Sequence, residues 1–283
     1  MTIAILGTGL LGSGFARALR KKGEVVRAWN RTVDRAQPLA ADGIEIAASA
    51  DAAVRGATRV HILVSDDAAV DAVLAAAAPG LAKGALVFDH STTSTAGVVR
   101  RTGESRELGI TYQHAPVFMG PQNALESTGL MLISGDAAVI ERARPLLTPM
   151  TGRLIELGPR VGAAAGYKLL GNLLLMAIAA GFTDMLALAK SMQMGASDIA
   201  TLLASFNPGV SLPSRFKRMA DADWANPSWE LAMARKDARL MQAEADQAGI
   251  VLAMLPAFAQ LMDAAIARGD GNADWTVVAK GLV

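Results

Sequence analysis

The sequence predicts an α/β fold: a doubly wound N-terminal domain of the Rossmann type, joined by a long helix to an all-α C-terminal domain. Short apolar or β-branched runs alternate with segments of helical period from residue 2 to about residue 156. A Gly-rich turn directly follows the first of these runs, and strand-like runs cease after LGPRVGAAAG at residues 157–166. Since 283 residues exceed what one compact core usually holds, we expect domains at residues 1–160 and 161–283.

The alternating part of the chain is typical of a mostly parallel sheet with helices on both faces, because each βαβ unit returns the next strand beside the last. The late runs Gly129–Ser134 and Arg153–Leu157 are expected as antiparallel strands at the edge of this sheet. The runs expected to form strands are TIAIL, VVRAW, RVHILV, ALVFD, ITYQH, LMLIS and RLIEL.

The rest of the chain is expected to be helical, with breakers such as NPG and RGDGN at the joints between helices. Ser228 is the expected N-cap of the fourth helix, because a serine hydroxyl can accept a hydrogen bond from a first-turn amide. The expected helices are 161–191, 196–205, 211–221, 228–248, 254–268 and 274–280.

Composition narrows the class of protein. Twenty-seven basic and 26 acidic side chains give a formal net charge of +1, without the basic excess of a nucleic-acid or membrane-surface binder. With no cysteine there can be no disulfide and no thiolate nucleophile or metal ligand, and we expect no metal site. The N-terminus lacks the basic region of a signal peptide. Residues 161–182 are long enough to cross a bilayer, but the lysine and asparagine inside them favour a buried helix in a cytoplasmic protein.

The Gly-rich turn has the pattern G-x-G-x-x-G, formed by Gly7, Gly9 and Gly12 between a strand and a helix. The first glycine permits the tight turn, the second lets the backbone approach a pyrophosphate, and the third lets the helix pack on the strand. The pyrophosphate is expected against the amides near Leu10 and Leu11. A Gly-rich turn without a ligand is the alternative, but the strand before and the helix after favour dinucleotide binding.

The end of the second strand indicates which dinucleotide is bound. An NAD site places an acidic residue there for the ribose hydroxyls, whereas this chain has Asn30, Arg31 and Thr32. A guanidinium with amide and hydroxyl donors suits a 2′-phosphate, which a carboxylate would repel. We therefore expect NADP(H) rather than NAD(H), the alternative being an arginine that is merely exposed on a turn.

Later strands are expected to end at the same edge of the sheet, where ligands of open α/β sheets bind. A hydroxyl in such a position is also a common helix cap, and Ser65 or Asp66 is expected to cap the helix that follows them. The residues delivered to this edge are Val64, Ser65, His90, Ser91, Thr92, His114, Phe118, Met119 and Gly120.

Lys168 and Asn172 lie four residues apart in the long helix and share one face of it. A lysine at the head of an apolar stripe can extend its ammonium to solvent along its aliphatic stem, and this is the structural alternative. That alternative does not account for the small residues on either side, GAAAG before the lysine and Gly171 after it, which leave room for another group to approach.

Six motifs together resemble the β-hydroxyacid dehydrogenase family, which includes 3-hydroxyisobutyrate dehydrogenase, tartronate semialdehyde reductase and glyoxylate/succinic semialdehyde reductases. The resemblance runs the whole length of the chain. The motifs are GTGLLG at 7–12, WNRT at 29–32, DHST at 89–92, APVFMG at 115–120, GAAAGYKLLGN at 162–172 and ARKDARL at 234–240.

The resemblance implies hydride transfer between NADP(H) and a small 3-hydroxy acid or semialdehyde. Lys168 matches the catalytic lysine, acting as general acid and base, and Asn172 matches an asparagine that helps hold substrate. Ser91 and Thr92 match the hydroxyl motif between nicotinamide and substrate, and Lys236 matches a lysine that touches cofactor. The resemblance also implies a homodimer or homotetramer associated through the α domain.

Two departures from the family pattern concern the substrate. Phe118 and Met119 stand where a serine and a glycine are expected to present donors to a substrate carboxylate, and Gly171 replaces the first of two asparagines. A reductase of imines or bulkier carbonyls is therefore one alternative, although such relatives generally lack the lysine. A non-catalytic NADP(H)-binding sensor is the other alternative, and it would tolerate loss of the lysine–asparagine pair that this chain retains.

Overall fold

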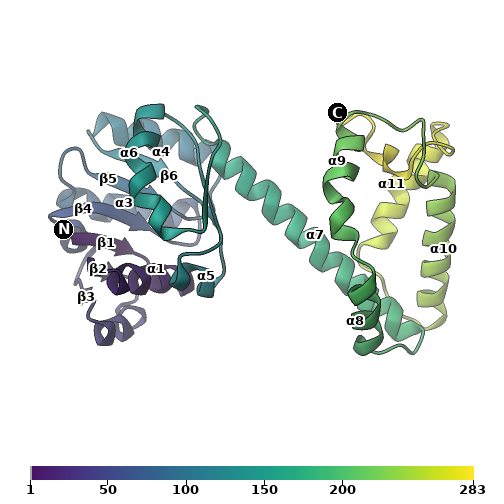
Figure 1. Ribbon diagram of the computed structural model, residues 1–283, viewed down its shortest axis with the longest axis horizontal. Coiled ribbons are helices and arrows are strands. Elements are labelled where there is room, and N and C mark those ends of the chain that lie inside the picture. The colour runs from purple at the N-terminus through teal and green to yellow at the C-terminus, as the bar shows by residue number, and fades with distance from the viewer. Residues whose placement is uncertain (1) are drawn as a thin grey trace. The chain divides into compact units, whose positions relative to one another are not determined.

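The computed structural model describes residues 2–283, which form two compact units, residues 2–172 and 173–283 (Figure 1). The division falls inside helix α7 (Ala163–Ser191), later than the boundary expected at residue 160. Its first turns belong to the first unit because Ala163, Ala164 and Ala165 are buried there. The Ala164 amide also donates to Ser134 Oγ, at 2.9 Å.

The first unit contains a six-stranded parallel sheet in the order β3-β2-β1-β4-β5-β6, which confirms the doubly wound fold. Helices cover both of its faces (Figure 1). The strand order reverses between β1 and β4, and at this point the carboxyl ends of two neighbouring strands leave a crevice for a ligand. The strands are β1 (Thr2–Leu6), β2 (Val25–Trp29), β3 (Glu45–Ile46), β4 (Ala57–Ile62), β5 (Leu86–Asp89) and β6 (Thr111–His114).

The expected edge strands form a separate three-stranded sheet instead, with β7 (Val117–Phe118) antiparallel to β8 (Leu130–Ile133) and β9 (Arg153–Glu156) parallel to β8. The prediction was therefore wrong in placing these strands at the edge of the large sheet, and wrong in expecting β9 to be antiparallel. Pro116 lies between β6 and β7 and has no N–H to donate, so the ladder cannot continue from one strand into the other. The remaining helices of the unit are α1 (Leu10–Lys21), α2 (Ala50–Val54), α3 (Asp67–Ala77), α4 (Thr95–Glu107), α5 (Pro121–Glu126) and α6 (Ala137–Leu147).

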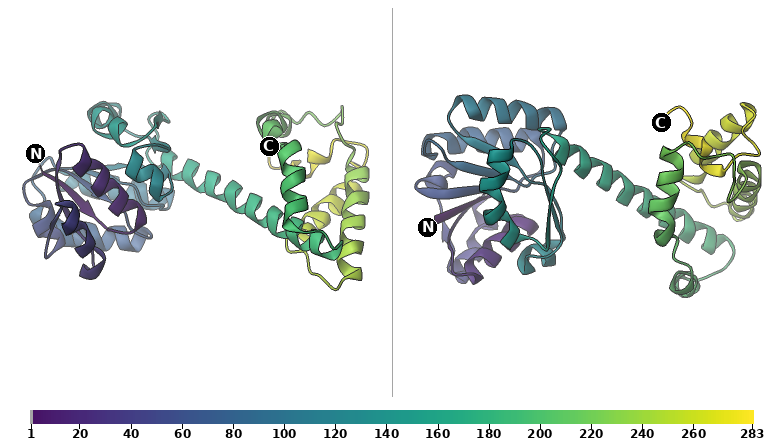
Figure 2. Two further views of the ribbon diagram at one scale, coloured as in Figure 1. Left: turned by 60° about the horizontal axis from the view of Figure 1, so that its bottom comes forward. Right: turned by 45° about the horizontal axis from the view of Figure 1, so that its top comes forward.

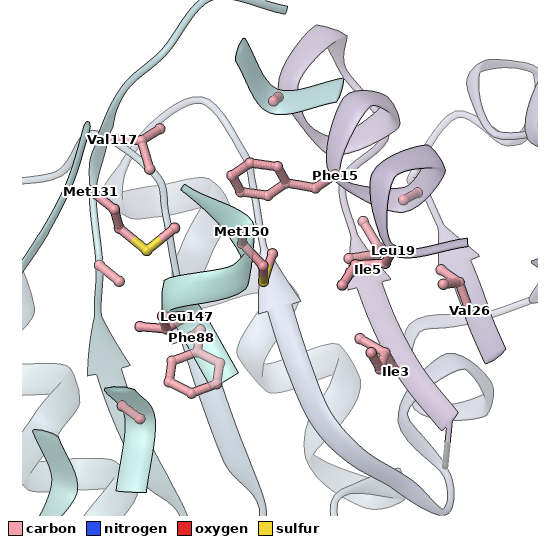
Figure 3. Packing of buried hydrophobic residues seen from close by; sticks show 14 of the residues in the cluster. Ile3, Ile5, Phe15, Leu19, Val26, Phe88, Val117, Met131, Leu147 and Met150 are labelled. Atoms are coloured by element: carbon pink, nitrogen blue, oxygen red, sulfur yellow. The ribbon is translucent and has the colours of Figure 1, made fainter. Parts of the chain in front are cut away.

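Two hydrophobic clusters hold the six-stranded sheet between its helices. Along β1, Ile3 and Ile5 point into one cluster while Ala4 and Leu6 point into the other, as the period of two in a strand requires. Figure 3 shows the first cluster, in which Phe15 of α1 points toward Met150, which follows α6, and toward side chains of the sheets. Full burial of one such large apolar side chain contributes about 1.5–3 kcal/mol, so α1 is fixed firmly beneath the Gly-rich turn.

Helices and short 3₁₀ turns make up the second unit (Figure 2). Its buried cluster includes Leu231, Met262 and Val277. Ser228 was predicted as the N-cap of α10, but α10 begins at Leu231 after Glu230. The Ser228 hydroxyl donates instead to the buried carboxylate of Asp274, at 2.8 Å. Besides the later part of α7, the unit contains α8 (Ala196–Ser205), α9 (Leu212–Ala220), α10 (Leu231–Gln247) and α11 (Leu255–Ala267).

Helix α7 is long and apolar enough to cross a membrane by length and composition alone. Only 11% of its most apolar window is buried by the rest of the chain, so the expectation of a buried helix was wrong for the single chain. Leu173, Leu175 and Met176 are each more than half exposed. An apolar surface of this length on one helix is a feature of association surfaces.

Candidate active site

The Gly-rich turn has the backbone geometry that its glycines were expected to provide. Gly7 has a φ of +101°, and a Cβ there would lie 2.2 Å from the Leu63 carbonyl oxygen. A Cβ at Gly12 would lie 1.9 Å from the Gly7 oxygen, so the helix can pack this closely only with glycine. At Gly9 a Cβ would meet no atom within 4 Å, which leaves its surface open to a ligand.

The first turn of α1 presents free amides beside this open surface. Gly9 is the N-cap and supplies no side-chain acceptor, and the turn contains no acidic residue. Leu10 is exposed and Leu11 is partly exposed at the start of the helix. Thr8 is buried, and its hydroxyl has no hydrogen-bond partner within residues 2–283. Unpaired donors at a helix N-terminus bind anions, so the turn fits the pyrophosphate of a dinucleotide.

Asn30 ties the end of β2 to this turn. Its Oδ1 accepts from the Thr8 amide at 3.0 Å, and its Nδ2 donates to the Thr32 carbonyl at 2.9 Å. One amide hydrogen of Asn30 is left over for a ligand. From the sequence, Asn30 was expected only to donate to a phosphate, whereas in the structure it also fixes the turn.

Arg31 and Thr32 are exposed just beyond Asn30. The Arg31 guanidinium makes no hydrogen bond or ion pair with any described residue, and neither does that of Arg35 in the following turn. Two unpaired guanidiniums within five residues form a positive loop end that suits an anionic group. Arg35 was not singled out from the sequence, because nothing but its nearness to Arg31 distinguishes it from other surface arginines.

The ends of β4 and β5 are joined side by side. The Val64 amide donates to the Ser91 hydroxyl at 3.0 Å, and the Ser91 amide donates to Asp89 Oδ1 at 2.9 Å. Ser91 is buried, whereas Thr92 beside it is partly exposed and its hydroxyl makes no hydrogen bond within residues 2–283. Thr92 is therefore the hydroxyl at this edge that is available to a ligand, and Ser91 holds the two loops together.

Ser65 and Asp66 follow Val64, and either was expected to cap the next helix. In the structure Asp66 caps α3. Asp66 Oδ1 accepts from the Ala69 amide at 2.8 Å, and the Ser65 hydroxyl donates to Asp66 Oδ2 at 2.8 Å. The backbone amide hydrogen bond is the largest cause of the lowered pKa of Asp66. Ser65 is thus engaged with the cap while remaining exposed at the crevice.

A buried polar chain supports the Ser91–Thr92 loop from below. Arg101, which is 1% exposed, pairs with Asp67 at 2.6 Å and its Nε donates to the Tyr112 hydroxyl at 3.1 Å. Tyr112 in turn donates to Asp89 Oδ2 at 2.5 Å. Burial, followed by the nearby Asp89 carboxylate, raises the pKa of Tyr112, which keeps the phenol protonated as a donor. Neither Arg101 nor Tyr112 was predicted from the sequence. The polar sequence of α4, which contains Arg101, resembles that of an exposed helix.

All three histidines of the chain lie buried beneath the same sheet edge. His90 Nδ1 lies 2.7 Å from the Ala115 carbonyl, which only accepts, so Nδ1 carries the proton and His90 Nε2 is an acceptor. His61 Nδ1, at 2.9 Å, must then donate to that nitrogen. His114 Nε2 likewise donates to the Ser91 carbonyl at 2.9 Å. His90 and His114 therefore hold the strand ends together rather than facing the crevice.

Burial lowers the pKa of each of these histidines. The pKa of His90 falls to about 4, chiefly through desolvation. The pKa of His61 lies well below its usual range, first because of desolvation and then because of the charge that His90 would carry when protonated. Desolvation lowers the pKa of His114 as well. All three rings are neutral near pH 7, which agrees with the tautomers that the hydrogen bonds require.

Lys168 is half-buried on α7, and its ammonium meets the ring of Phe118. Lys168 Nζ lies 4.1 Å from the ring centroid, within the range of a cation–π contact. Nζ has no hydrogen bond or ion pair with any residue of 2–283. Burial lowers the pKa of Lys168, and no neighbouring charge contributes to the shift. Asn172, one turn further on, is partly exposed on the same face.

The other expected substrate residues lie on and after β7. Phe118 is partly buried against α7, Gly120 is exposed as the N-cap of α5, and Met119 packs against the large core cluster of the first unit. Met119 therefore faces the core rather than Lys168. Lys236 lies on α10 of the second unit, where its Nζ is 2.8 Å from Asp237. Within residues 2–283 no three histidine or acidic side chains come together as a metal site would need.

The whole chain matches two family models. Residues 2–158 match the NAD-binding domain of 6-phosphogluconate dehydrogenase, and residues 162–282 match the NAD-binding domain of NADP-dependent 3-hydroxyisobutyrate dehydrogenase. Among curated proteins, a probable 3-hydroxyisobutyrate dehydrogenase of Mycobacterium tuberculosis is 30% identical over 202 residues, which cover 70% of this chain and 67% of the length of that protein. The 3-sulfolactaldehyde reductase of Escherichia coli is 26% identical over 98% of this chain and 94% of its own.

Among solved structures, the imine reductase of Myxococcus stipitatus in complex with NADP⁺ has a TM-score of 0.92 to this chain. It is 20% identical over the full length of both chains, so the likeness concerns the fold alone. The relatives that share more of the sequence are dehydrogenases and reductases. The chain is thus an oxidoreductase with an NAD(P)-binding Rossmann domain, and it belongs to the β-hydroxyacid dehydrogenase family.

Proposed function

We propose that this protein is an NADP(H)-dependent oxidoreductase that interconverts a small hydroxy compound and its carbonyl, with Lys168 as the general acid and base. The observation that carries the proposal is the state of that lysine. Its ammonium is half-buried, has no ion-pair partner among residues 2–283, and its pKa is lowered by burial. A lysine so placed exchanges a proton more readily near neutral pH than an exposed one does.

The residues around the Gly-rich turn fit the cofactor. Gly9 leaves an open surface, the Thr8 hydroxyl is an unpaired buried group, and the first amides of α1 are free. These groups would hold the pyrophosphate, while Val64, Ser65 and Thr92 at the neighbouring strand ends would contact other parts of the cofactor. Lys236, which matches a cofactor-contacting lysine of the family, is proposed as a further cofactor ligand. When bound, the nicotinamide supplies or accepts the hydride.

Lys168 meets the charge that the reaction creates. As a carbonyl is reduced, negative charge grows on its oxygen, and an ammonium stabilises that charge and donates a proton to the oxygen. In the direction of oxidation the neutral amine accepts the hydroxyl proton, which a lowered pKa favours. Asn172 shares the helix face and would orient the substrate through its amide.

The preference for NADP(H) is proposed from Arg31. Its guanidinium is exposed and unpaired beyond the end of β2, and Arg35 adds a second positive charge. Arg31→Ala should weaken NADPH binding at least tenfold and NADH binding less than threefold, because a charge-assisted bidentate contact contributes about 1.5–3 kcal/mol. Equal losses for both cofactors in fluorescence titrations would contradict the proposed contact with the 2′-phosphate.

The catalytic assignment is tested with Lys168→Ala, and Lys190→Ala serves as the control because Lys190 is exposed near the end of the same helix. Loss of the proton donor should lower kcat by about 10²–10⁴-fold, while NADPH binding changes less than threefold. The assay follows NADPH oxidation at a wavelength near 340 nm with glyoxylate and with succinic, tartronic and methylmalonic semialdehydes. Unchanged turnover in Lys168→Ala would remove the role proposed for this residue.

A second candidate, reduction of imines or bulkier carbonyls, is supported by the aromatic ring beside Lys168. A cyclic imine in the same substrate panel separates the two. If the imine is reduced faster than every aldehyde, and Lys168→Ala leaves that rate intact, this second candidate replaces the first. If NADPH binds but no substrate in the panel turns over, a non-catalytic NADP(H)-binding sensor becomes the better description.

We further infer that a second copy of this chain covers the apolar surface of α7, giving a soluble homodimer or homotetramer in the cytoplasm. Leu173, Leu175 and Met176 are exposed in the single chain, although Leu and Met side chains favour burial. Sedimentation of purified protein should give at least twice the mass of one chain, and Leu173→Asp with Met176→Asp should lower that mass. Recovery of the expressed protein in the membrane fraction would instead favour insertion of α7 into a bilayer.

A further inference from the structure

Two residues on different elements lie in close contact beside Lys168: Phe118 on β7 and Gly171 on α7. A Cβ built at Gly171 would lie 2.3 Å from Cζ of Phe118 and 2.7 Å from its Cε1, which is closer than any real contact. The ring therefore fills the place that a side chain at position 171 would take. Only glycine at 171 allows the ring to lie there.

The same ring closes one side of the lysine. Its face is 4.1 Å from Nζ of Lys168, which makes no polar contact with any described residue. The surroundings of Nζ thus contain an aromatic face and no charged group close enough to contribute to the pKa of the lysine. Met119, the neighbour of Phe118, packs against the core and offers nothing polar in exchange.

We propose that Phe118, seated against Gly171, determines substrate choice by placing an apolar wall beside Lys168 Nζ, so that aldehydes and ketones with an uncharged apolar substituent are preferred over those with a carboxylate in its place. The inference deepens the proposed function and rests on it. A substrate oxygen that accepts from Nζ lies about 2.7–3.0 Å from it. The substituent of such a substrate comes within contact distance of a ring that is 4.1 Å from the same nitrogen.

The chemistry of the ring explains the choice. The face of an aromatic ring carries negative partial charge, which attracts the ammonium and repels a carboxylate. A carboxylate buried against it would also lose its hydration without gaining a donor from residue 118. An apolar substituent loses no hydrogen bonds there, and its burial against the ring is favourable.

A matched pair of aldehydes tests the proposal. Succinic semialdehyde and 4-methylpentanal have the same chain, with a carboxylate in one where the other has an isopropyl group of similar shape. With wild-type protein and NADPH, kcat/KM should be at least tenfold higher for 4-methylpentanal, as expected for discrimination by a hydrophobic pocket. In Phe118→Ser the ratio should fall at least tenfold, through a higher KM for 4-methylpentanal.

The role of Gly171 is tested by Gly171→Ala, with Gly166→Ala as the control on the same helix. A Cβ at Gly166 would make only an ordinary contact, 3.5 Å from Thr95 Cγ2, so this variant should keep the wild-type ratio. Gly171→Ala displaces the ring and should lower the ratio as Phe118→Ser does. The double variant Phe118→Ser with Gly171→Ala relieves the clash and should recover the melting temperature of Phe118→Ser, which separates misfolding from loss of selectivity.

A binding measurement makes the inference independent of turnover. In calorimetry with the NADPH complex, 4-methylpentanamide should bind at least tenfold tighter than succinamate to the wild type, and Phe118→Ser should remove the difference. Equal binding of the two amides, or a tenfold preference of the wild type for succinic semialdehyde, would overturn the inference about Phe118. The proposed function would still stand in that case if reduction of the aldehydes depends on Lys168. Selective amide binding without reduction of either aldehyde supports the wall and refutes the catalytic proposal.

Discussion

The buried histidines make the stability of the first unit depend on pH in a definite direction. The pKa of His90 is about 4 in the folded chain and 6.5 as its ordinary value, so the unfolded chain binds a proton that the folded chain rejects. Stability from this residue is therefore complete above about pH 6.5 and is lost as the pH falls from there toward 4. Between pH 7.5 and pH 5 the loss from His90 alone amounts to about 2 kcal/mol.

His61 adds to this loss because its pKa is lowered further, through burial and through the charge that protonated His90 would place beside it. His61→Phe removes one titrating ring from between Phe88 and His90, where it stacks at centroid distances of 5.2 Å. Urea unfolding at pH 7.5 and pH 5 should show a smaller difference in unfolding free energy for His61→Phe than for wild type, because one group that resists protonation in the folded chain is gone.

The native state offers a direct second measurement. Proton NMR of the ring C–H groups should show every histidine titrating below its ordinary pKa of 6.5 in the folded protein, and full titration near pH 6.5 in urea. A native histidine with a pKa near 6.5, or equal pH dependence of unfolding in wild type and His61→Phe, would refute the assignment of neutral buried rings. No other histidine can contribute to these signals, since the chain has three histidines and all of them, His61, His90 and His114, are buried beneath the same sheet edge.

Three further predictions concern separate parts of the chain. Arg101→Met should cost about 1–3 kcal/mol in urea unfolding because the buried Tyr112 hydroxyl loses a hydrogen-bond donor, whereas Arg100→Met, at an exposed neighbour, should cost less than about 1 kcal/mol. Gly9→Ala should keep the melting temperature, since its Cβ meets no atom within 4 Å, yet weaken NADPH binding, whereas Gly12→Ala should lower both. Asp184→Ala should destabilise the second unit by about 2 kcal/mol, seen as faster amide exchange, because its carboxylate accepts from three backbone amides at residues 253–255.

The sequence was sufficient for those features that depend on local pattern. The seven expected strands, the Gly-rich turn and the long helix expected over residues 161–191 follow from periodicity and from glycine positions, and the structure confirms them, with the helix at Ala163–Ser191. The two-residue strands β3 and β7 were not expected. The separate small sheet was missed, because its existence depends on how Pro116 interrupts pairing between strands distant in sequence. Ser228 was misplaced for a similar reason, since its hydroxyl bonds a carboxylate 46 residues away.

The candidate site was predicted in its residues but not in its contacts. Lys168 was singled out as one charge in an apolar run, while its meeting with the Phe118 ring depends on a strand and a helix that lie far apart in the chain. The support of Ser91 by Asp89, Tyr112 and Arg101 was likewise hidden, because each of these residues alone has an ordinary surface or strand context. Pairing across the fold, rather than residue type, was the missing information.

The tight fit of Phe118 against Gly171 also restricts the order in which these two positions can change over generations. A larger residue at 171 is blocked while the ring is present, because its first side-chain carbon would overlap the ring at 2.3 Å. Loss of the ring first leaves an unfilled space, which a later substitution at 171 can occupy. Descendants of this chain can therefore acquire a bulkier residue on the helix only by way of an intermediate that has already lost the aromatic side chain on the strand.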